Sequence, residues 1–133
     1  MKGNVLTISM AETVSKRVLV VEDNELNLKL FCDLLRAHGH DAAPVRDGRE
    51  AFARAREFNP DLIITDIQLP HVTGLDLIAS FRADEKLASV PIMAVTAYAG
   101  LGDEERIRAA GASAYVSKPI SVMRFMEVVN GLF

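Results

Sequence analysis

The sequence predicts an α/β protein in which five βα units form three layers, with a parallel five-stranded sheet between two layers of helices. Short apolar runs alternate with segments whose apolar residues recur at helical spacing, a pattern typical of repeated βα units. The runs at 17–21, 62–65 and 91–96 show no apolar/polar alternation. Strands of this kind are buried on both faces, as they are in a parallel sheet covered by helices.

The first half of the chain is expected to supply three strands and two helices. We place strands at 17–21, 41–45 and 62–65, and helices at 25–38 and 47–58. Gly39 follows the first helix and Asn59-Pro60 follows the second, and such residues commonly end helices. The strand at 41–45 has the weakest signal, because it is hardly apolar and contains Pro44. An edge position in the sheet would tolerate that proline.

The second half of the chain continues the alternation. We place helices at 74–83, 103–110 and 121–131, and strands at 91–96 and 114–117. Pro91 opens one of these strands, and Gly111 follows the helix at 103–110. That helix has few large apolar side chains, which predicts weak packing and an element that can move.

The composition indicates one soluble domain at 16–133, preceded by a flexible tail at 1–15. The formal net charge of the 133-residue chain is −3, and its Lys and Arg residues are scattered, which gives no support for binding nucleic acid or anionic membranes. A single cysteine, Cys32, excludes an internal disulfide and a Cys-based metal cage. No apolar run approaches the roughly 20 residues of a membrane span, and no signal peptide is visible, so we expect a cytoplasmic protein.

Polar residues end four of the apolar runs, at the edge of the sheet where α/β proteins bind their ligands. In the strand order 2-1-3-4-5, that binding position lies between the first and third strands. Glu22 and Asp23 follow the first strand, and Asp66 follows the third. Three carboxylates brought together repel one another, and a divalent cation relieves that repulsion. A set of oxygen ligands favours Mg²⁺ over zinc or copper.

The same strand ends carry motifs that resemble the receiver domains of two-component response regulators. The motifs are Val-Glu-Asp-Asn at 21–24, Asp-Ile-Gln-Leu-Pro at 66–70 with Gly74, Thr-Ala at 96–97, and Lys-Pro at 118–119. Each motif is weak alone, but all four stand in order and each lies at a strand end. The resemblance covers about 16–133 and implies a (βα)₅ flavodoxin-like fold. The segments 22–31, 102–108 and 118–121 resemble, within that family, single-domain regulators of cell division, which implies a role in cell-cycle control.

The resemblance implies a role for each acidic residue. Asp66 would be the phosphoryl acceptor, taking the group from a sensor histidine kinase or a histidine phosphotransfer protein. Asp23 and Asp66 would bind Mg²⁺ directly, together with the backbone carbonyl of Gln68, and Glu22 would bind it through a water molecule. The protein would then be a signalling protein that catalyses only its own phosphotransfer and slow dephosphorylation, for which Tyr98 could shield the acyl phosphate.

The resemblance also implies how the phosphoryl group is held and sensed. Lys118 would pair first with Asp66 and then with the phosphoryl oxygens, and Thr96 would donate its hydroxyl to another of those oxygens. Thr96 would move toward the phosphoryl group, and Tyr115 would swing inward behind it. Tyr115 could instead be a half-buried tyrosine that simply packs on the helix at 103–110. Pro119 is expected to follow a cis peptide bond, as in the family.

Two surfaces are candidates for contact with partner proteins. The first is an output face formed by 103–110, 114–117 and 121–131, with the helix at 25–38 as an alternative. On that helix, we expect Leu30, Phe31, Leu34 and Leu35 to form the buried face and Leu26 and Leu28 to lie at its margins. The second surface pairs Leu26 with Ile120 beside the acidic site, where a histidine-bearing helix could dock. Ordinary packing at the helix margin is the alternative explanation for both side chains.

Other functions on the same architecture remain open. An aspartyl-phosphate phosphatase would need a second acid two residues after its nucleophile, where this chain has Gln68. A flavin-binding module would bind a phosphate at 22–25, but that loop is acidic and lacks glycine. A pseudo-receiver that binds partners without phosphorylation is disfavoured by the complete acidic site and by Lys118.

Overall fold

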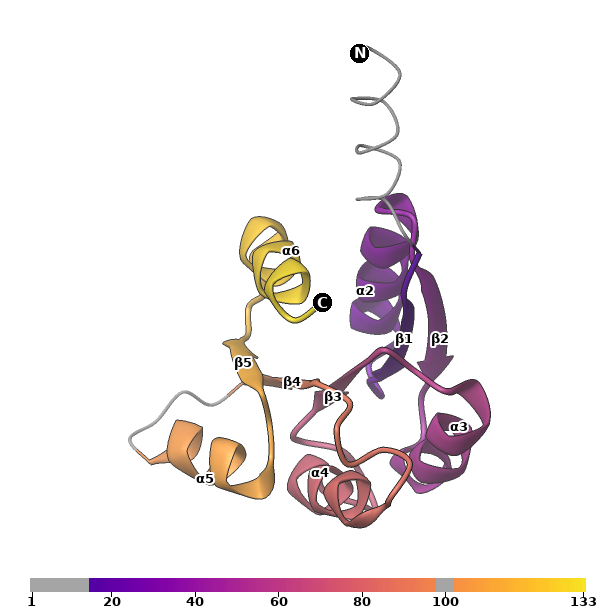
Figure 1. Ribbon diagram of the computed structural model, residues 1–133. Helices are drawn as coiled ribbons and strands as arrows, with labels where there is room; N and C mark the ends of the chain where they lie inside the picture. Colours follow the sequence, from indigo (N-terminus) through magenta and orange to yellow (C-terminus); the bar gives the residue numbers. More distant parts are fainter. Residues whose placement is uncertain (1–14, 98–101) are drawn as a thin grey trace, which may run out of the picture.

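The computed structural model describes residues 15–97 and 102–133 and contains one five-stranded parallel sheet (Figure 1). The strands lie in the order β2-β1-β3-β4-β5, which confirms the predicted topology. Their bounds are Arg17–Val21 for β1, Asp41–Val45 for β2, Leu62–Asp66 for β3, Ile92–Thr96 for β4 and Ala114–Ser117 for β5. The helices are α2 (Glu25–Ala37), α3 (Ala51–Phe58), α4 (Gly74–Ala83), α5 (Asp103–Ala110) and α6 (Val122–Gly131).

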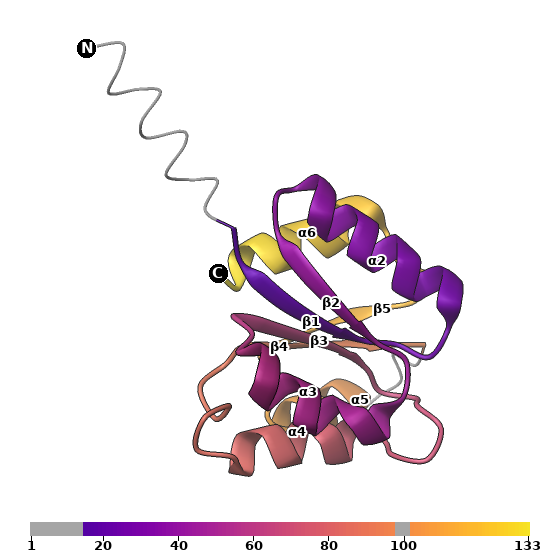
Figure 2. The ribbon, with the colours of Figure 1, turned by 90° about the vertical axis from the view of Figure 1, so that its right-hand side faces the viewer.

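The helices cover both faces of the sheet and complete the three predicted layers. Helices α2 and α6 lie on one face, and α3, α4 and α5 lie on the other (Figure 2). Among the described residues, no helix has both the length and the apolar character that crossing a bilayer requires. Strands β1, β3 and β4 are inside the sheet, where all but the first residue of β1 are buried, as their unbroken apolar runs predicted.

The expected elements are all present, with small shifts at their ends. The helix expected at 47–58 begins as a 3₁₀ turn, Gly48–Glu50, because the Asp47 side chain accepts a hydrogen bond from the backbone N–H of Arg49 and caps that turn. Pro44 lies on β2, which is an edge strand, and the residue is exposed. The sheet edge therefore accommodates the missing N–H group of the proline.

Two apolar cores fill the spaces on either side of the sheet. An aromatic stack stabilises the core that lies between the sheet and helices α2 and α6. Phe31 of α2 and Phe125 of α6 stack with their ring centroids 4.9 Å apart, and both are almost fully buried. The sequence-based assignment of the buried face of α2 was partly wrong. The face comprises Leu28, Phe31, Cys32 and Leu35, whereas Leu30 is 38% exposed.

The error on α2 arises because leucines occur on several sides of the helix. Leu28 and Leu30 are separated by about 200° around the helix axis, so only one of them can face the sheet. Contact with Phe125 fixes Phe31 inside, and Leu28 stands one turn before Phe31 on the same side. Leu30 is thereby turned toward solvent.

Phe125→Ala should lower the free energy of unfolding by about 3–5 kcal/mol, because the change removes a buried ring and leaves a cavity beside Phe31. Met123→Ala is the matched control on the same helix, since Met123 is 80% exposed, and it should change the stability by less than about 0.5 kcal/mol. Urea unfolding of both variants measures the difference. Equal losses in the two variants would contradict the role assigned to the Phe31–Phe125 stack.

Candidate functional site

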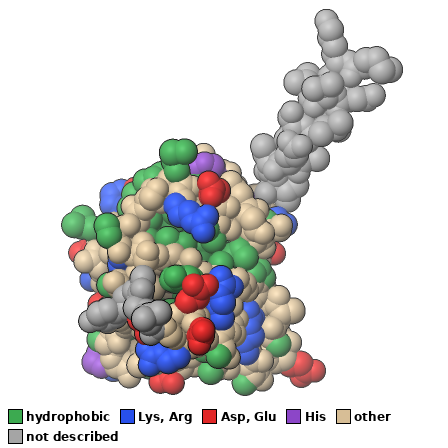
Figure 3. Space-filling view, turned by 90° about the vertical axis from the view of Figure 1, so that its left-hand side faces the viewer, with side chains coloured by type: hydrophobic (Ala, Val, Ile, Leu, Met, Phe, Trp, Pro, Cys, Tyr) green, Lys and Arg blue, Asp and Glu red, His purple; other side chains and the backbone are tan. Residues whose placement is uncertain are grey.

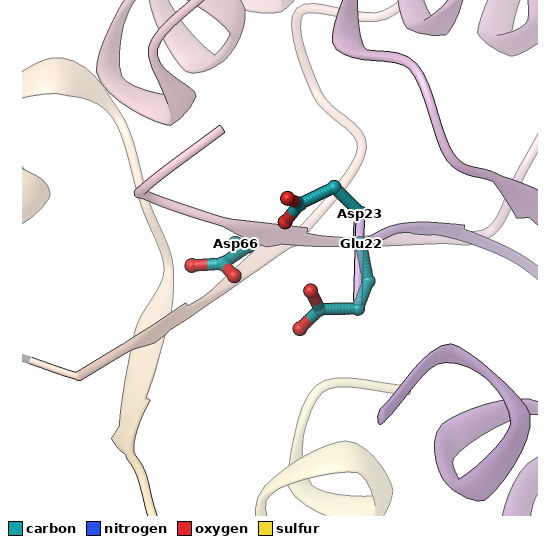
Figure 4. A group of neighbouring side chains, drawn as sticks. All are labelled: Glu22, Asp23 and Asp66. Atoms are coloured by element: carbon teal, nitrogen blue, oxygen red, sulfur yellow. The ribbon is translucent and has the colours of Figure 1, made fainter. Parts of the chain in front are cut away.

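The three predicted acidic residues gather at the carboxyl edge of the sheet (Figure 4). Glu22 and Asp23 directly follow β1, and Asp66 is the last residue of β3. Strands β1 and β3 are neighbours in parallel register, with Val21 beside Thr65, so their ends meet. One carboxylate oxygen from each of the three residues lies within 4.8 Å of the others. The topology therefore produces the convergence that the sequence predicted.

Burial makes this group of charges electrostatically unfavourable without a cation. Glu22 is 1% exposed and Asp66 is 4% exposed. Burial raises the pKa of the Glu22 carboxyl above its ordinary value, against the opposing hydrogen bond from the backbone N–H of Asn24, and the nearby Asp66 charge raises it further. The negative form of Glu22 is thus disfavoured in the folded protein.

Lys118 supplies the positive charge within this group. Its Nζ donates a hydrogen bond to Asp66 Oδ2 at 2.8 Å and lies 3.0 Å from Glu22 Oε1. Burial opposes the charged ammonium, but the hydrogen bond to Asp66 and the negative charges of Asp66 and Glu22 outweigh it and raise the pKa of Lys118. One ammonium group therefore offsets part of the charge of two buried carboxylates.

The carboxylates fit a small hard cation. Glu22 Oε1 is buried and accepts no hydrogen bond from the described residues, although Lys118 Nζ lies 3.0 Å away as its ion-pair partner. A buried acceptor of this kind needs water or a metal ion to satisfy it. All three side chains offer oxygen ligands, which Mg²⁺ prefers. Gln68 is exposed on the same rim, and its N–H donates to Asp66 Oδ1 at 3.1 Å.

The loop after Asp66 depends on a glycine that lies against the backbone of Asp66. Gly74 N donates to Ile67 O at 2.9 Å, which closes the loop between β3 and α4. A Cβ atom on Gly74 would lie only 2.2 Å from Asp66 O, so no other residue fits without displacing the backbone at Asp66. Gly74 is therefore needed for the shape of the site as well as for the turn.

The remaining predicted residues occupy the neighbouring strand ends. Thr96 is buried at the end of β4, and the N–H of Lys118 donates to its carbonyl at 2.7 Å. The peptide bond between Lys118 and Pro119 is cis. Tyr115 on β5 is half-buried against the core below the sheet, and the negative charge of Glu104 on α5 raises the pKa of its phenol. Tyr98 lies outside the described residues.

The two predicted docking residues differ in exposure. Leu26 at the start of α2 is 80% exposed, whereas Ile120 is half-buried and packs against the core formed by α2 and α6. The sequence reasoning missed Met123, which is also 80% exposed at the start of α6. The exposure of Met123 could have been predicted from the sequence, because Met123 and Phe125 are separated by about 200° around the helix axis and Phe125 is buried.

Comparison with known protein families and sequences identifies relatives over nearly the whole chain. The family model described as response regulator receiver domain matches residues 18–130. The polar-differentiation response regulator DivK of Brucella ovis is 54% identical over 117 residues, which is 88% of this chain and 95% of that protein. DivK of Brucella anthropi is 54% identical over 115 residues, which is 86% of this chain and 94% of the relative.

Solved structures share the same fold. The chemotaxis protein CheY4 of Vibrio cholerae matches with a TM-score of 0.85 over 90% of this chain and 100% of its own, at 24% identity, which supports the fold alone. The receiver domain of the sensor histidine kinase PA1611 of Pseudomonas aeruginosa matches with a TM-score of 0.82 at 32% identity, covering 90% of this chain and 98% of its own. That structure has a magnesium ion coordinated in its active-site cleft.

Glu22→Gln should stabilise the metal-free protein at pH 7, because the raised pKa of Glu22 shows that its charge is disfavoured in the fold. The contribution of Glu22 to stability is fully present below its unfolded-state pKa and is lost as the pH rises through its higher folded-state pKa. Glutamine does not titrate, so the advantage of the variant should shrink as the pH falls from 7 toward 4.5, the ordinary pKa of the carboxyl.

Urea unfolding in EDTA across this pH range measures the effect, and Glu25→Gln, at an exposed position on α2, is the control. An advantage that does not vary with pH, or a Gln variant that is less stable than the parent at pH 7, would contradict this assignment.

Proposed function

This chain belongs to the response regulator receiver family, and we propose that it accepts a phosphoryl group on Asp66 from a phosphohistidine of a partner protein. The observation that carries the proposal is the environment of the Asp66 carboxylate. Its carboxylate is buried, lies beside two further carboxylates and is held by Lys118 at 2.8 Å. A core aspartate with a purely structural role has no need of such neighbours.

The transfer would be a displacement at phosphorus. An oxygen of the Asp66 carboxylate attacks the phosphorus, the P–N bond to the donor imidazole breaks, and the electron pair of that bond stays on the imidazole nitrogen. The product is an acyl phosphate on Asp66. Phosphoryl transfer depends mainly on positioning and charge compensation. The hydrogen bond from Gln68 N to Asp66 Oδ1 fixes the orientation of the nucleophile.

Magnesium fits the acidic group, and we infer that Asp23, Asp66 and the carbonyl of Gln68 hold it, with Glu22 acting through a water molecule. When bound, the ion compensates the charge on the carboxylates and on the transferring phosphoryl oxygens. Lys118 is already beside Asp66 and would move its hydrogen bond to a phosphoryl oxygen. Thr96 would donate its hydroxyl to another.

We infer that the signal leaves through the face formed by α5, β5 and α6, with α2 as the alternative. Thr96 lies at the end of β4, and Tyr115 lies on the neighbouring strand within reach of the Glu104 charge on α5. A shift of Thr96 toward the phosphoryl group would let Tyr115 turn inward and change this face. Figure 3 views the molecule from this side, where acidic and basic side chains lie close together. The output would be contact with another protein.

The donor would dock at an apolar surface beside the acidic site, which we call the rim patch and define as Leu26, Ile120 and Met123. Leu26 and Met123 are both 80% exposed, at the first turns of α2 and α6. Large apolar side chains this exposed contribute binding energy when a partner covers them. A helix that presents a phosphohistidine could cover the patch while its imidazole reaches Asp66.

The cellular role that we propose is control of cell division or polar differentiation in the cytoplasm. Its support is the similarity to the polar-differentiation regulators named DivK, which extends over 95% of the length of the Brucella ovis protein. Sensor histidine kinases or a histidine phosphotransfer protein would then be the donors.

Asp66→Asn should abolish phosphorylation, because the amide lacks the nucleophilic carboxylate. Incubation of the protein with Mg²⁺ and acetyl phosphate, followed by intact-mass measurement, should show one added phosphoryl group on the parent and none on the variant. Asp76→Asn is the control, since Asp76 is an exposed aspartate at the start of α4 and should leave phosphorylation unchanged. Modification of the Asp66→Asn protein to the same extent as the parent would refute the assignment of the acceptor.

Leu26→Asp and Met123→Asp should each slow transfer from a phosphorylated histidine kinase by about tenfold, the effect of losing about 1.4 kcal/mol of contact energy. Phosphorylation by acetyl phosphate should be unchanged, because that donor needs no docking surface. Ala53→Asp, on the exposed side of α3, is the control. Rapid-quench kinetics with the kinase that transfers fastest to the parent protein give the rates. Equal slowing with both donors would show damage to the site itself, and unchanged kinase rates would eliminate the rim patch.

A further inference from the structure

Thr65 is the one buried polar side chain among the described residues that the proposed function does not use. The other three, Glu22, Asp66 and Thr96, belong to the acidic site or would hold the phosphoryl group. Thr65 is fully buried on β3, one residue before the proposed acceptor and directly after the apolar residues 62–64. Burying a hydroxyl is unfavourable unless it forms a hydrogen bond, so its presence in this strand needs a reason.

The neighbours of Thr65 in the sheet would pack equally well against a valine. Thr65 lies beside Val21 of β1 and Ala94 of β4, and both of these residues belong to the apolar core on the side of α3, α4 and α5. Threonine and valine are both branched at Cβ and have nearly the same shape, so packing alone does not select the hydroxyl. The hydroxyl donates to Asp66 O at 3.0 Å. This hydrogen bond distinguishes Thr65 from an apolar core residue.

The peptide unit that follows Asp66 is held by two hydrogen bonds and one steric contact. Its carbonyl oxygen accepts the bond from Thr65, and its N–H group, on Ile67, donates to Val95 O at 2.9 Å. Gly74 lies so close to the same carbonyl that a Cβ atom there would be 2.2 Å from Asp66 O. The contact with Gly74 limits the position of this peptide plane, and the two hydrogen bonds fix its rotation.

The next peptide unit leads to Gln68, whose carbonyl would bind the metal ion. Its own carbonyl, on Ile67, accepts from Gly74 N at 2.9 Å, and Gln68 N donates to Asp66 Oδ1 at 3.1 Å. If Asp66 and Gln68 supply oxygens to one ion, the rotation of the two intervening peptide units determines whether those oxygens can face it together. Of the four hydrogen bonds that fix these units, only the Thr65 bond comes from a side chain that is not itself a proposed ligand.

We propose that Thr65 is a positioning residue for the acceptor site. Its hydroxyl holds the Asp66 carbonyl so that the carboxylate of Asp66 and the carbonyl of Gln68 are presented to one divalent cation. The proposal rests on the function proposed above, because it takes both residues as ligands of Mg²⁺. Without the hydroxyl, the peptide unit after Asp66 rotates more freely, and metal binding then has to order it.

Two pairs of variants that differ in the Thr65 hydroxyl test this role. Thr65→Val lacks the hydroxyl of the parent protein, and Thr65→Ala lacks the hydroxyl that Thr65→Ser retains. NMR titration, followed at the Gln68 amide, measures the dissociation constant for Mg²⁺. In each pair, the protein without the hydroxyl should bind Mg²⁺ about tenfold more weakly, since replacing groups that orient metal ligands commonly has an effect of this size. Thr65→Ser should bind Mg²⁺ as the parent does, because it keeps the donor.

Amide hydrogen exchange in EDTA is a second measurement, and it needs no metal. Loss of the hydroxyl should raise exchange at Ile67 and Gln68 about fivefold or more and leave exchange at Ile64, inside β3, unchanged. Ser80→Ala is the control, because the half-buried Ser80 hydroxyl also donates to a carbonyl, that of Leu77 on α4, at 2.8 Å. This control should change neither the affinity for Mg²⁺ nor exchange at Gln68.

Unchanged Mg²⁺ affinity in Thr65→Val, or equal affinities in Thr65→Ser and Thr65→Ala, would overturn the positioning role. Exchange that rises uniformly through the sheet, including at Ile64, would also overturn it, because that result shows a loss of stability alone. If Thr65→Val does not fold, the comparison of Thr65→Ser with Thr65→Ala decides. A parent protein that binds no Mg²⁺ and takes up no phosphoryl group from acetyl phosphate would refute the proposed function and this role with it. Normal binding and phosphorylation of the parent, with no effect of the hydroxyl, would refute the role of Thr65 alone.

Discussion

The constraint on which this structure depends is the convergence of three carboxylates at the end of a buried sheet. The strands that deliver Glu22, Asp23 and Asp66 are apolar and tightly enclosed, so the carboxylates cannot separate by moving the backbone. Their repulsion has to be relieved by positive charge brought to them. Lys118, which follows β5 on the other side of β4, provides one positive charge. A cation that prefers oxygen ligands would provide a second positive charge.

Lys118 links three strands that would otherwise end independently. Its backbone N–H bonds to the carbonyl of Thr96 at the end of β4, and its ammonium bonds to Asp66 at the end of β3. A phosphoryl group on Asp66 would add charge where Lys118 and Thr96 already meet. The charge repulsion in the unphosphorylated site and the response to phosphorylation therefore depend on the same contacts, those of Lys118 with Asp66 and Thr96. This dependence is the usual compromise between stability and activity at a functional site.

Sequence periodicity was sufficient to predict nearly every element boundary. Given the strand order 2-1-3-4-5 of the fold that the resemblance implies, the strand-end residues then predicted the meeting of Glu22, Asp23 and Asp66, because that order places the ends of β1 and β3 side by side. Periodicity failed on the buried face of α2, where leucines on opposite sides of the helix make the pattern ambiguous and tertiary contact with Phe125 selects Leu28 over Leu30. The hydrogen bonds that Arg82 on α4 donates to Gly111 O and Ser113 Oγ could not be predicted either, because a long side chain joins residues separated by up to 31 positions.

Both helical layers expose ion pairs, but among the described residues the exposed large apolar side chains lie on or directly after α2 and α6, and this placement suits the proposed function. On one face, Leu26 and Met123 expose large apolar side chains next to the acidic site, as a surface that a partner covers would. On the other face, α5 exposes ion pairs such as Glu104–Arg108, which contribute little to stability and can be exchanged at little cost. A donor bound at the rim patch would leave α5 uncovered. Binding at the rim patch and a response at α5 and β5 can therefore coexist on one small domain, although α6 belongs to both surfaces.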